Sequence, residues 1–214
     1  MRKYFLQSLL FIHIIAGSVS LLAAALAVVS AKGKKVHIWA GRTYFWGMFL
    51  IFITAIPMSI VSSNLFLFLV AIFSFYLAYA GMRFARNRTG IANKFDWAAI
   101  GLMVLSGIAM WCLATVYFMN NNTQYITLAV FGFIAISLGC ADFRSYRNKS
   151  AIGKQRIARH LTNMLAGTIA VITAVLVTNL NIQPIFILWV LPTILITPLI
   201  FWWNRRTLSG NKDI

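Results

Sequence analysis

The sequence predicts an all-α membrane protein, a polytopic bundle of seven transmembrane helices. Hydrophobic residues occupy 61% of the 214 positions and charged residues only 10%, whereas a soluble domain carries roughly 25% charged residues. The mean hydropathy is +0.82, and the apolar residues form long stretches separated by short polar connections. A surface this poor in charge is suited to lipid rather than to water.

Seven apolar segments are each long enough to cross a bilayer, at about 20 residues per helix. The first follows a basic start, as in a signal peptide, but it continues to about Ser30 without an obvious cleavage site, so we expect a retained helix. Because all connections are short, residues 1–214 are predicted to form one integral membrane domain. The segments are Tyr4–Ser30, His37–Ser62, Asn64–Arg86, Trp97–Met119, Gln124–Ser145, His160–Asn179 and Gln183–Asn204.

The positive charges predict how these segments are oriented. Of the 19 Lys and Arg residues, 17 fall in four patches, and the connections 62–64, 120–123 and 180–182 carry no charge. Cytoplasmic connections are enriched in Lys and Arg, so we expect the N-terminus outside the cell, the C-terminus in the cytoplasm, and an inner-membrane location. Arg2 and Lys3 oppose this orientation but are outnumbered. The patches are Lys32, Lys34, Lys35 and Arg42; Arg83, Arg86, Arg88 and Lys94; Arg144, Arg147, Lys149, Lys154, Arg156 and Arg159; and Arg205, Arg206 and Lys212.

The composition also limits which partners and which chemical reactions we expect of this chain. The formal net charge of +16 sits at the ends of apolar segments, where it meets anionic lipid headgroups, so the expected partner is the bilayer and not nucleic acid. Both assembly into a homo-oligomer and membership of a larger membrane complex are compatible with this sequence. Cys112 and Cys140 lack metal-ligand spacing and are interpreted as packing residues. No Walker A, GxSxG or HExxH sequence is present, so we predict no catalytic residue and do not expect an enzyme.

Small residues predict where helices touch, because they allow two backbones to approach closely. The fourth segment contains Gly101 and Gly107, and the fifth contains Gly132 and Gly139. Proline removes an intrahelical hydrogen bond and is expected to bend a helix. The prolines within segments are Pro57, Pro192 and Pro198.

Ionisable side chains within a bilayer are costly, so each of them needs a role. Asp142 lies near the basic end of the fifth segment, and a carboxylate there requires a partner such as Arg144, Arg147, Arg159 or His160. His37 opens the second segment and His160 opens the sixth, so the predicted topology places both at the cytoplasmic boundary. The sequence therefore predicts a cytoplasmic-side cluster of His37, Arg42, Asp142, Arg159 and His160.

This cluster allows three interpretations: a structural salt bridge between the fifth and sixth segments, a site for protons or a small anion, or a single b-type haem with His37 and His160 as axial ligands. No CxxCH sequence is present, which excludes c-type attachment. No metal-ion site is predicted. His13 is either an interhelical hydrogen-bond donor or a further proton-handling residue. Asp96 is predicted to cap a helix start, and Asp213 to lie in a solvated tail.

Five strings occur together in this chain: HIIAG, KKVHIWAGRTYFW, IFSFYLAYAGMR, DFRSYR and ARHLTNMLAGTIAVITAVLV. They resemble an uncharacterised bacterial family of multi-pass membrane proteins, common in Bacteroidota and described only as a domain of unknown function. The resemblance covers nearly the whole chain but implies no activity. Some members have Arg after the histidine that matches His37, where this chain has Ile38. The positions that the resemblance singles out are His13, Gly17, His37, Gly41, Arg42, Asp142, Arg144, His160 and Asn179.

The leading functional hypothesis from the sequence is a membrane-embedded binding or transport-like protein. Its cytoplasmic-side cluster of His, Asp and Arg would handle protons or a small anionic ligand. The alternatives are a single-haem redox protein that uses His37 and His160, and a non-catalytic subunit of a membrane complex.

Overall fold

The computed structural model describes residues 2–209, which form seven α-helices, each long and apolar enough to cross a membrane. No strand occurs in this range, so the predicted all-α fold with seven spanning helices is confirmed. Lys212 and Asp213 lie outside the described residues. The helices are α1 (Arg2–Val29), α2 (Lys35–Val61), α3 (Leu65–Arg86), α4 (Lys94–Met119), α5 (Tyr125–Arg147), α6 (Gly153–Asn179) and α7 (Phe186–Ser209).

Several helices extend beyond the predicted apolar segments at their basic ends. α4 begins at Lys94 rather than Trp97, and α6 begins at Gly153 rather than His160. Lys and Arg are good helix formers, and their long side chains reach water from a terminal turn. Basic residues that the sequence pattern assigned to connections therefore belong to helix ends. As a result, Arg159 and His160 are consecutive residues inside α6 and point about 100° apart around its axis.

The start of α4 is fixed by a reciprocal pair of hydrogen bonds. The Asp96 backbone N–H donates to the Asn93 side-chain oxygen over 2.9 Å, and the Asn93 backbone N–H donates to Asp96 Oδ2 over 2.9 Å. Such a capping box satisfies two backbone donors that the helix itself cannot pair. The predicted capping role of Asp96 is confirmed, with Asn93 as the N-cap residue.

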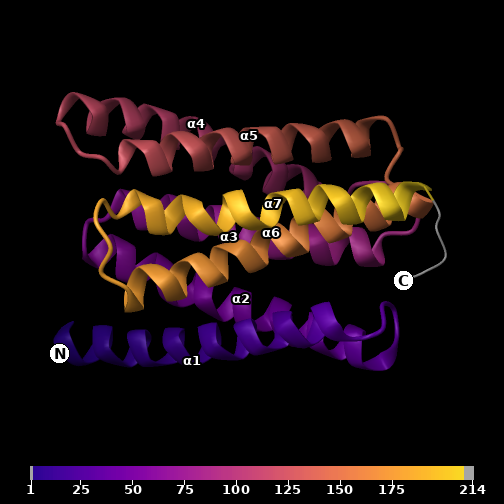
Figure 1. Cartoon of the computed structure of the whole chain (residues 1–214), viewed down its shortest axis with the longest axis horizontal. Helices are drawn as coiled ribbons and strands as arrows, with labels where there is room; N and C mark the ends of the chain where they lie inside the picture. Colours follow the sequence, from indigo (N-terminus) through magenta and orange to yellow (C-terminus); the bar gives the residue numbers. More distant parts are fainter. Residues whose placement is uncertain (1, 210–214) are drawn as a thin grey trace.

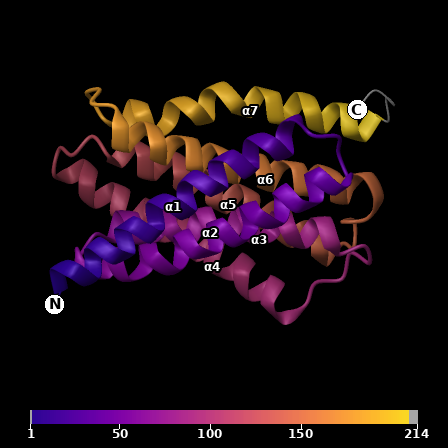
Figure 2. The same ribbon diagram turned by 90° about the horizontal axis from the view of Figure 1, so that it is seen from below.

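The helices are arranged in three layers (Figure 1). The α4–α5 hairpin forms one side and the α1–α2 hairpin the other, with α3, α6 and α7 between them. α3 contacts α2, α4 and α6, and α6 contacts α1, α3 and α7, so α3 and α6 form the centre of the bundle. Seen from below, α1 runs obliquely across this central layer (Figure 2).

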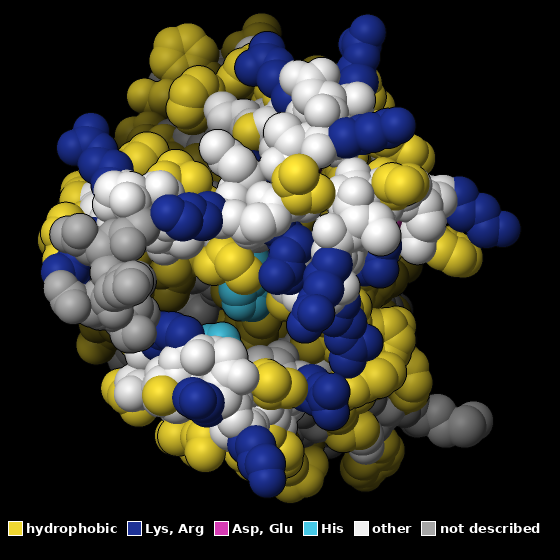
Figure 3. All heavy atoms as spheres, turned by 90° about the vertical axis from the view of Figure 1, so that its right-hand side faces the viewer, with side chains coloured by type: hydrophobic (Ala, Val, Ile, Leu, Met, Phe, Trp, Pro, Cys, Tyr) yellow, Lys and Arg dark blue, Asp and Glu magenta, His cyan; other side chains and the backbone are white. Residues whose placement is uncertain are grey.

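Consecutive helices run in opposite directions, so the basic connections gather at one end of the bundle. The connections 30–34, 87–93 and 148–152 lie at this end together with the last turn of α7, at the right of Figure 1. Figure 3 shows this end with Lys and Arg side chains distributed around it. We call it the basic end.

Glycines bring α4 and α5 into backbone contact. A Cβ atom at Gly107 would lie 2.9 Å from the Gly132 carbonyl oxygen and 2.9 Å from the Ala135 Cβ. A Cβ atom at Gly139 would lie 2.7 Å from a methyl carbon of Val104. The predicted contact at Gly101 is wrong, because no atom lies within 4 Å of its Cβ position. Six residues separate Gly101 from Gly107, and that spacing places them far apart around the helix axis.

The substitution Gly107→Ala should therefore lower the free energy of unfolding by about 1–3 kcal/mol, because the added methyl group collides with the backbone of α5. The matched change Gly101→Ala adds the same methyl group to the same helix in open space. It should leave stability unchanged or raise it by up to about 1 kcal/mol. Thermal unfolding in detergent, followed by circular dichroism, measures both. Equal effects would contradict the α4–α5 contact.

Candidate functional site

The Asp142 carboxylate is fully buried and receives hydrogen bonds from three side chains. Arg159 donates to Oδ1 through Nε over 2.8 Å and also through Nη2. Tyr76 donates its hydroxyl to Oδ2 over 2.8 Å, and Asn163 donates its amide to Oδ2 over 3.3 Å. These residues come from α3, α5 and α6, so one carboxylate links three helices near the basic end.

The guanidinium group of Arg159 is held as firmly as the carboxylate. Its Nη2 also donates to the Leu138 carbonyl over 3.3 Å, and its carbon lies 5.9 Å from the centre of the Phe84 ring. Two opposite charges in a site without water are stabilised only when their remaining donors and acceptors are also paired. Asp142 has no exposed surface through which a ligand could reach it. This arrangement is that of a structural ion pair.

His37 and His160 form a separate pair on the other side of α6. Their ring centres lie 6.3 Å apart, and the ring planes are nearly perpendicular, at 85°. His37 Nδ1 lies 3.0 Å from the Ala27 carbonyl oxygen, and His160 Nδ1 lies 2.8 Å from the Gly81 carbonyl oxygen. A carbonyl oxygen only accepts, so each Nδ1 carries the proton. In the neutral ring, each Nε2 then keeps a lone pair.

Neither Nε2 atom has a hydrogen-bond partner among the described residues. Neither of them is fully buried. Space is also open one turn after His37. A Cβ atom at Gly41 would meet only the terminal methyl of Met164, at 4.0 Å. Gly41 is therefore not required for close helix contact. Histidine side chains are visible at the base of a hollow in the basic end (Figure 3).

A lysine lies beside this pair. Lys32 Nζ donates to the Ala27 carbonyl over 3.1 Å, the same oxygen that receives His37 Nδ1, and also to the carbonyls of Val28 and Ser30. It thereby pairs carbonyl groups that the last turn of α1 leaves free. Partial burial lowers the pKa of Lys32 from its usual value. The surroundings of His37 are thus electropositive.

Arg42, which was predicted for the cluster, and His13, a separate candidate, both lie elsewhere. Arg42 is exposed and makes no hydrogen bond or ion pair within the described part of the chain. It follows His37 by five residues, which turns it to a different side of α2. His13 bonds to Thr54 Oγ1 over 2.9 Å, and that hydroxyl is itself bonded to carbonyls of α2. His13 precedes Ala27 by a span of roughly 21 Å along α1.

A second buried carboxylate pairs with a cation between α3 and α4. Arg83 binds Asp96 through two parallel hydrogen bonds, Nε to Oδ1 over 2.6 Å and Nη2 to Oδ2 over 2.7 Å. Tyr79 adds a hydrogen bond to Oδ1 over 3.1 Å. Arg83, Tyr76 and Tyr79 were not predicted as partners from the sequence. A tyrosine within an apolar segment could have indicated such a partner, because a buried hydroxyl usually has a hydrogen-bond partner.

No protein-family model, curated protein or solved structure matches this chain. The resemblance to a bacterial membrane-protein family therefore stays a prediction, and the site is interpreted from its own geometry.

The ion pair can be tested by removing its negative charge without changing its shape. The substitution Asp142→Asn should lower the free energy of unfolding by about 3 kcal/mol, because Arg159 keeps only 17% of its side-chain surface exposed and loses its counter-charge. The double variant Asp142→Asn, Arg159→Met should recover at least half of this loss. Arg144→Gln, at an exposed position of the same helix, is the control and should be neutral. Additive losses in the double variant would contradict the pairing.

Proposed function

We propose that this chain is a multi-pass membrane protein that binds one b-type haem between His37 and His160. The observation that carries the proposal is the separation of the two imidazole ring centres, 6.3 Å. A bond from a metal to an imidazole nitrogen is about 2 Å long, and the ring centre lies roughly 1 Å beyond that nitrogen. Two imidazoles on opposite sides of one iron therefore have ring centres about 6 Å apart.

The hydrogen bonds of the two rings support the same proposal. A histidine that binds a metal usually donates its other ring N–H to a backbone carbonyl or a carboxylate, which fixes the tautomer and the ring orientation. His37 and His160 both do this through Nδ1. Each therefore keeps Nε2 as the available ligand. The two rings come from α2 and α6, helices of different layers, so the axial ligands would enter from two sides.

The donor set favours a porphyrin over a bare metal ion. The described residues contain no group of three or more His, Cys, Asp or Glu side chains that could hold an ion. A porphyrin supplies four nitrogen ligands itself and needs only two from the protein. Its propionates are anionic, and Lys32 gives the site a positive charge close to His37. At Gly41, one turn after His37, an added Cβ atom would meet only the terminal methyl of Met164, at 4.0 Å.

A haem with two histidine ligands has no free position for oxygen, so its iron is suited to carrying single electrons. The protein would contribute the two histidine ligands, their orientation, and the surroundings, Lys32 among them, that set the reduction potential. None of these roles requires Asp142.

The same histidine pair supports a second candidate, binding of protons or a small anion. The observation that favours it is that neither Nε2 atom has a hydrogen-bond partner among the described residues, while Lys32 lies beside His37. Two imidazoles close together can take up a proton and then bind an anion. The two candidates differ in whether the protein is coloured.

Purification from cells supplied with excess haem should yield one haem per chain, with a Soret band and a low-spin ferric signal. His37→Ala and His160→Ala should each reduce bound haem at least tenfold, because each removes an axial ligand. His13→Ala is the matched control and should retain it, since His13 bonds to Thr54 and lies away from the histidine pair.

Loss of haem through misfolding is excluded by a rescue. In His160→Gly the missing ring leaves a space, and added imidazole should restore the low-spin spectrum. A colourless wild-type protein would sink the haem proposal and favour the anion site. In that case, pH-dependent anion binding should disappear in the same two histidine variants.

We further propose that the basic end faces the cytoplasm, with the N-terminus outside and the protein in the inner membrane. The supporting observation is that the three basic connections share one end of the bundle, and such charge favours the cytoplasmic side.

Cysteine labelling in whole cells tests this orientation. In a background with Cys112→Ala and Cys140→Ala, a membrane-impermeant maleimide should label Asn122→Cys directly and Lys154→Cys only after permeabilisation. Position 122 lies in the uncharged α4–α5 connection and position 154 in the first turn of α6, at opposite ends of the bundle. The reverse labelling pattern would overturn the orientation.

A further inference from the structure

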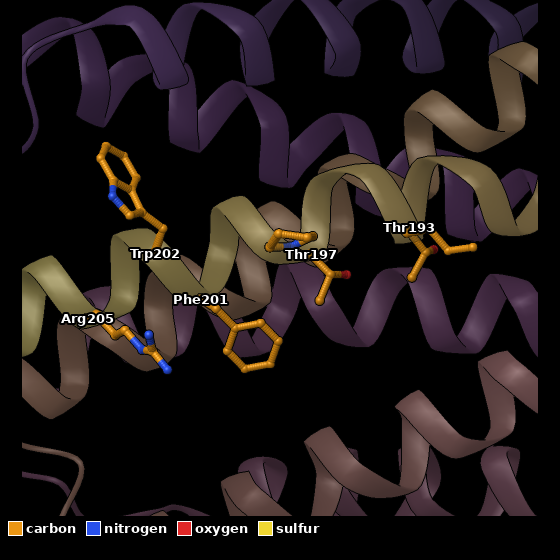
Figure 4. A pocket seen from close by; sticks show the side chains of 7 residues that line it. Thr193, Thr197, Phe201, Trp202 and Arg205 are labelled. Carbon is orange, nitrogen blue, oxygen red and sulfur yellow. The ribbon is translucent and has the colours of Figure 1, made fainter.

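α7 has a groove along one side that none of the roles described so far requires. It is an open groove of about 620 Å³, lined by residues of α7 alone. Figure 4 shows its side chains. The residues that line it are Thr193, Ile194, Thr197, Pro198, Phe201, Trp202 and Arg205.

Four lining residues follow one another at intervals of four: Thr193, Thr197, Phe201 and Arg205. This spacing places them along one side of the helix, and their side chains project to the same side of α7 in Figure 4. The row starts with small side chains, continues with an aromatic ring and ends with a cation at the basic end. The row thus changes from uncharged side chains to a positive charge toward the end of the helix.

The length of this row matches one leaflet of a membrane. Twelve residues of helix separate Thr193 from Arg205, which corresponds to roughly 18 Å. Half of a hydrocarbon core of about 30 Å is about 15 Å. The groove therefore extends from the headgroup level of one leaflet to near the bilayer centre.

Arg205 is available to a ligand, unlike its neighbour. Arg205 is exposed and has no hydrogen bond or ion pair within the described residues. The guanidinium carbon of Arg206 instead lies 4.6 Å from the centre of the Trp202 ring, in a cation–π contact. The two arginines at the end of α7 therefore differ in role.

From these observations we infer that the groove binds an anionic phospholipid, with the phosphate on Arg205 and one acyl chain along Phe201, Pro198 and Thr197. Charge complementarity selects the headgroup, because a guanidinium group binds phosphate through charge-assisted hydrogen bonds. A second transmembrane helix fits less well, because close helix contacts use small residues along the whole interface, whereas this row ends in Phe201 and Arg205.

The test uses the full-length protein in nanodiscs that contain phosphatidylcholine with one fifth phosphatidylglycerol. After transfer to a mild detergent, native mass spectrometry counts the phosphatidylglycerol molecules retained per chain. Arg205→Gln should lower this retention about fivefold. Arg206→Gln removes the same charge one residue later and should leave retention unchanged. Thr197→Trp should also lower retention, because the larger side chain fills the groove while Arg205 stays in place.

Equal losses in Arg205→Gln and Arg206→Gln would overturn the inference, because they would show a general effect of surface charge. A dimer mass that disappears in Thr197→Trp would also overturn it and would assign the groove to a second copy of the chain. Circular dichroism of each variant ensures that only folded protein is compared.

Discussion

The buried pairing of Asp142 with Arg159 is the interaction on which the basic half of the bundle depends. In hydrocarbon no water is available to solvate either charge, so the two groups must meet, and the meeting fixes the depth and the rotation of α6 against α5. Tyr76 extends the same constraint to α3. Because His160 follows Arg159 directly, the rotation that directs Arg159 toward α5 also directs His160 toward α3 and α2. The structural ion pair thereby orients the histidine pair.

The two hairpins are attached to the centre of the bundle by different means. On one side, Arg83 and Asp96 add a second ion pair between α3 and α4, and glycines hold α4 against α5. On the other side, the described residues contain no ion pair between the α1–α2 hairpin and its neighbours. His37 is the residue that this hairpin contributes to the site, and its partner Ala27 belongs to the same hairpin. The histidine pair thus adds a contact between the α1–α2 hairpin and the central layer.

Most of the fold could be predicted from the sequence, because length and apolarity define a membrane span without knowledge of its neighbours. The basic end followed from charge alone, since short connections force consecutive helices to alternate in direction. Which side chains meet could not be predicted in the same way. Arg159 was one of several candidate partners for Asp142. It is the rotation of α6 that turns Arg159, and not the neighbouring His160, toward Asp142. Arg42 likewise lies outside the site because of its angular position on α2. The sequence pattern placed residues at the same depth but did not give that angle.

The buried carboxylates do not contact the imidazole rings of His37 and His160, and this separation affects what the histidine pair can bind. If Asp142 faced the histidines, its charge would favour protonated rings, and protonated rings cannot bind a metal. In this structure both described carboxylates are bound to arginines, and the histidines receive their orientation from backbone carbonyls instead. Carbonyls fix the tautomer without adding a full negative charge. The proton on each Nδ1 leaves Nε2 free to act as a ligand, which is the condition that axial ligation of a haem requires.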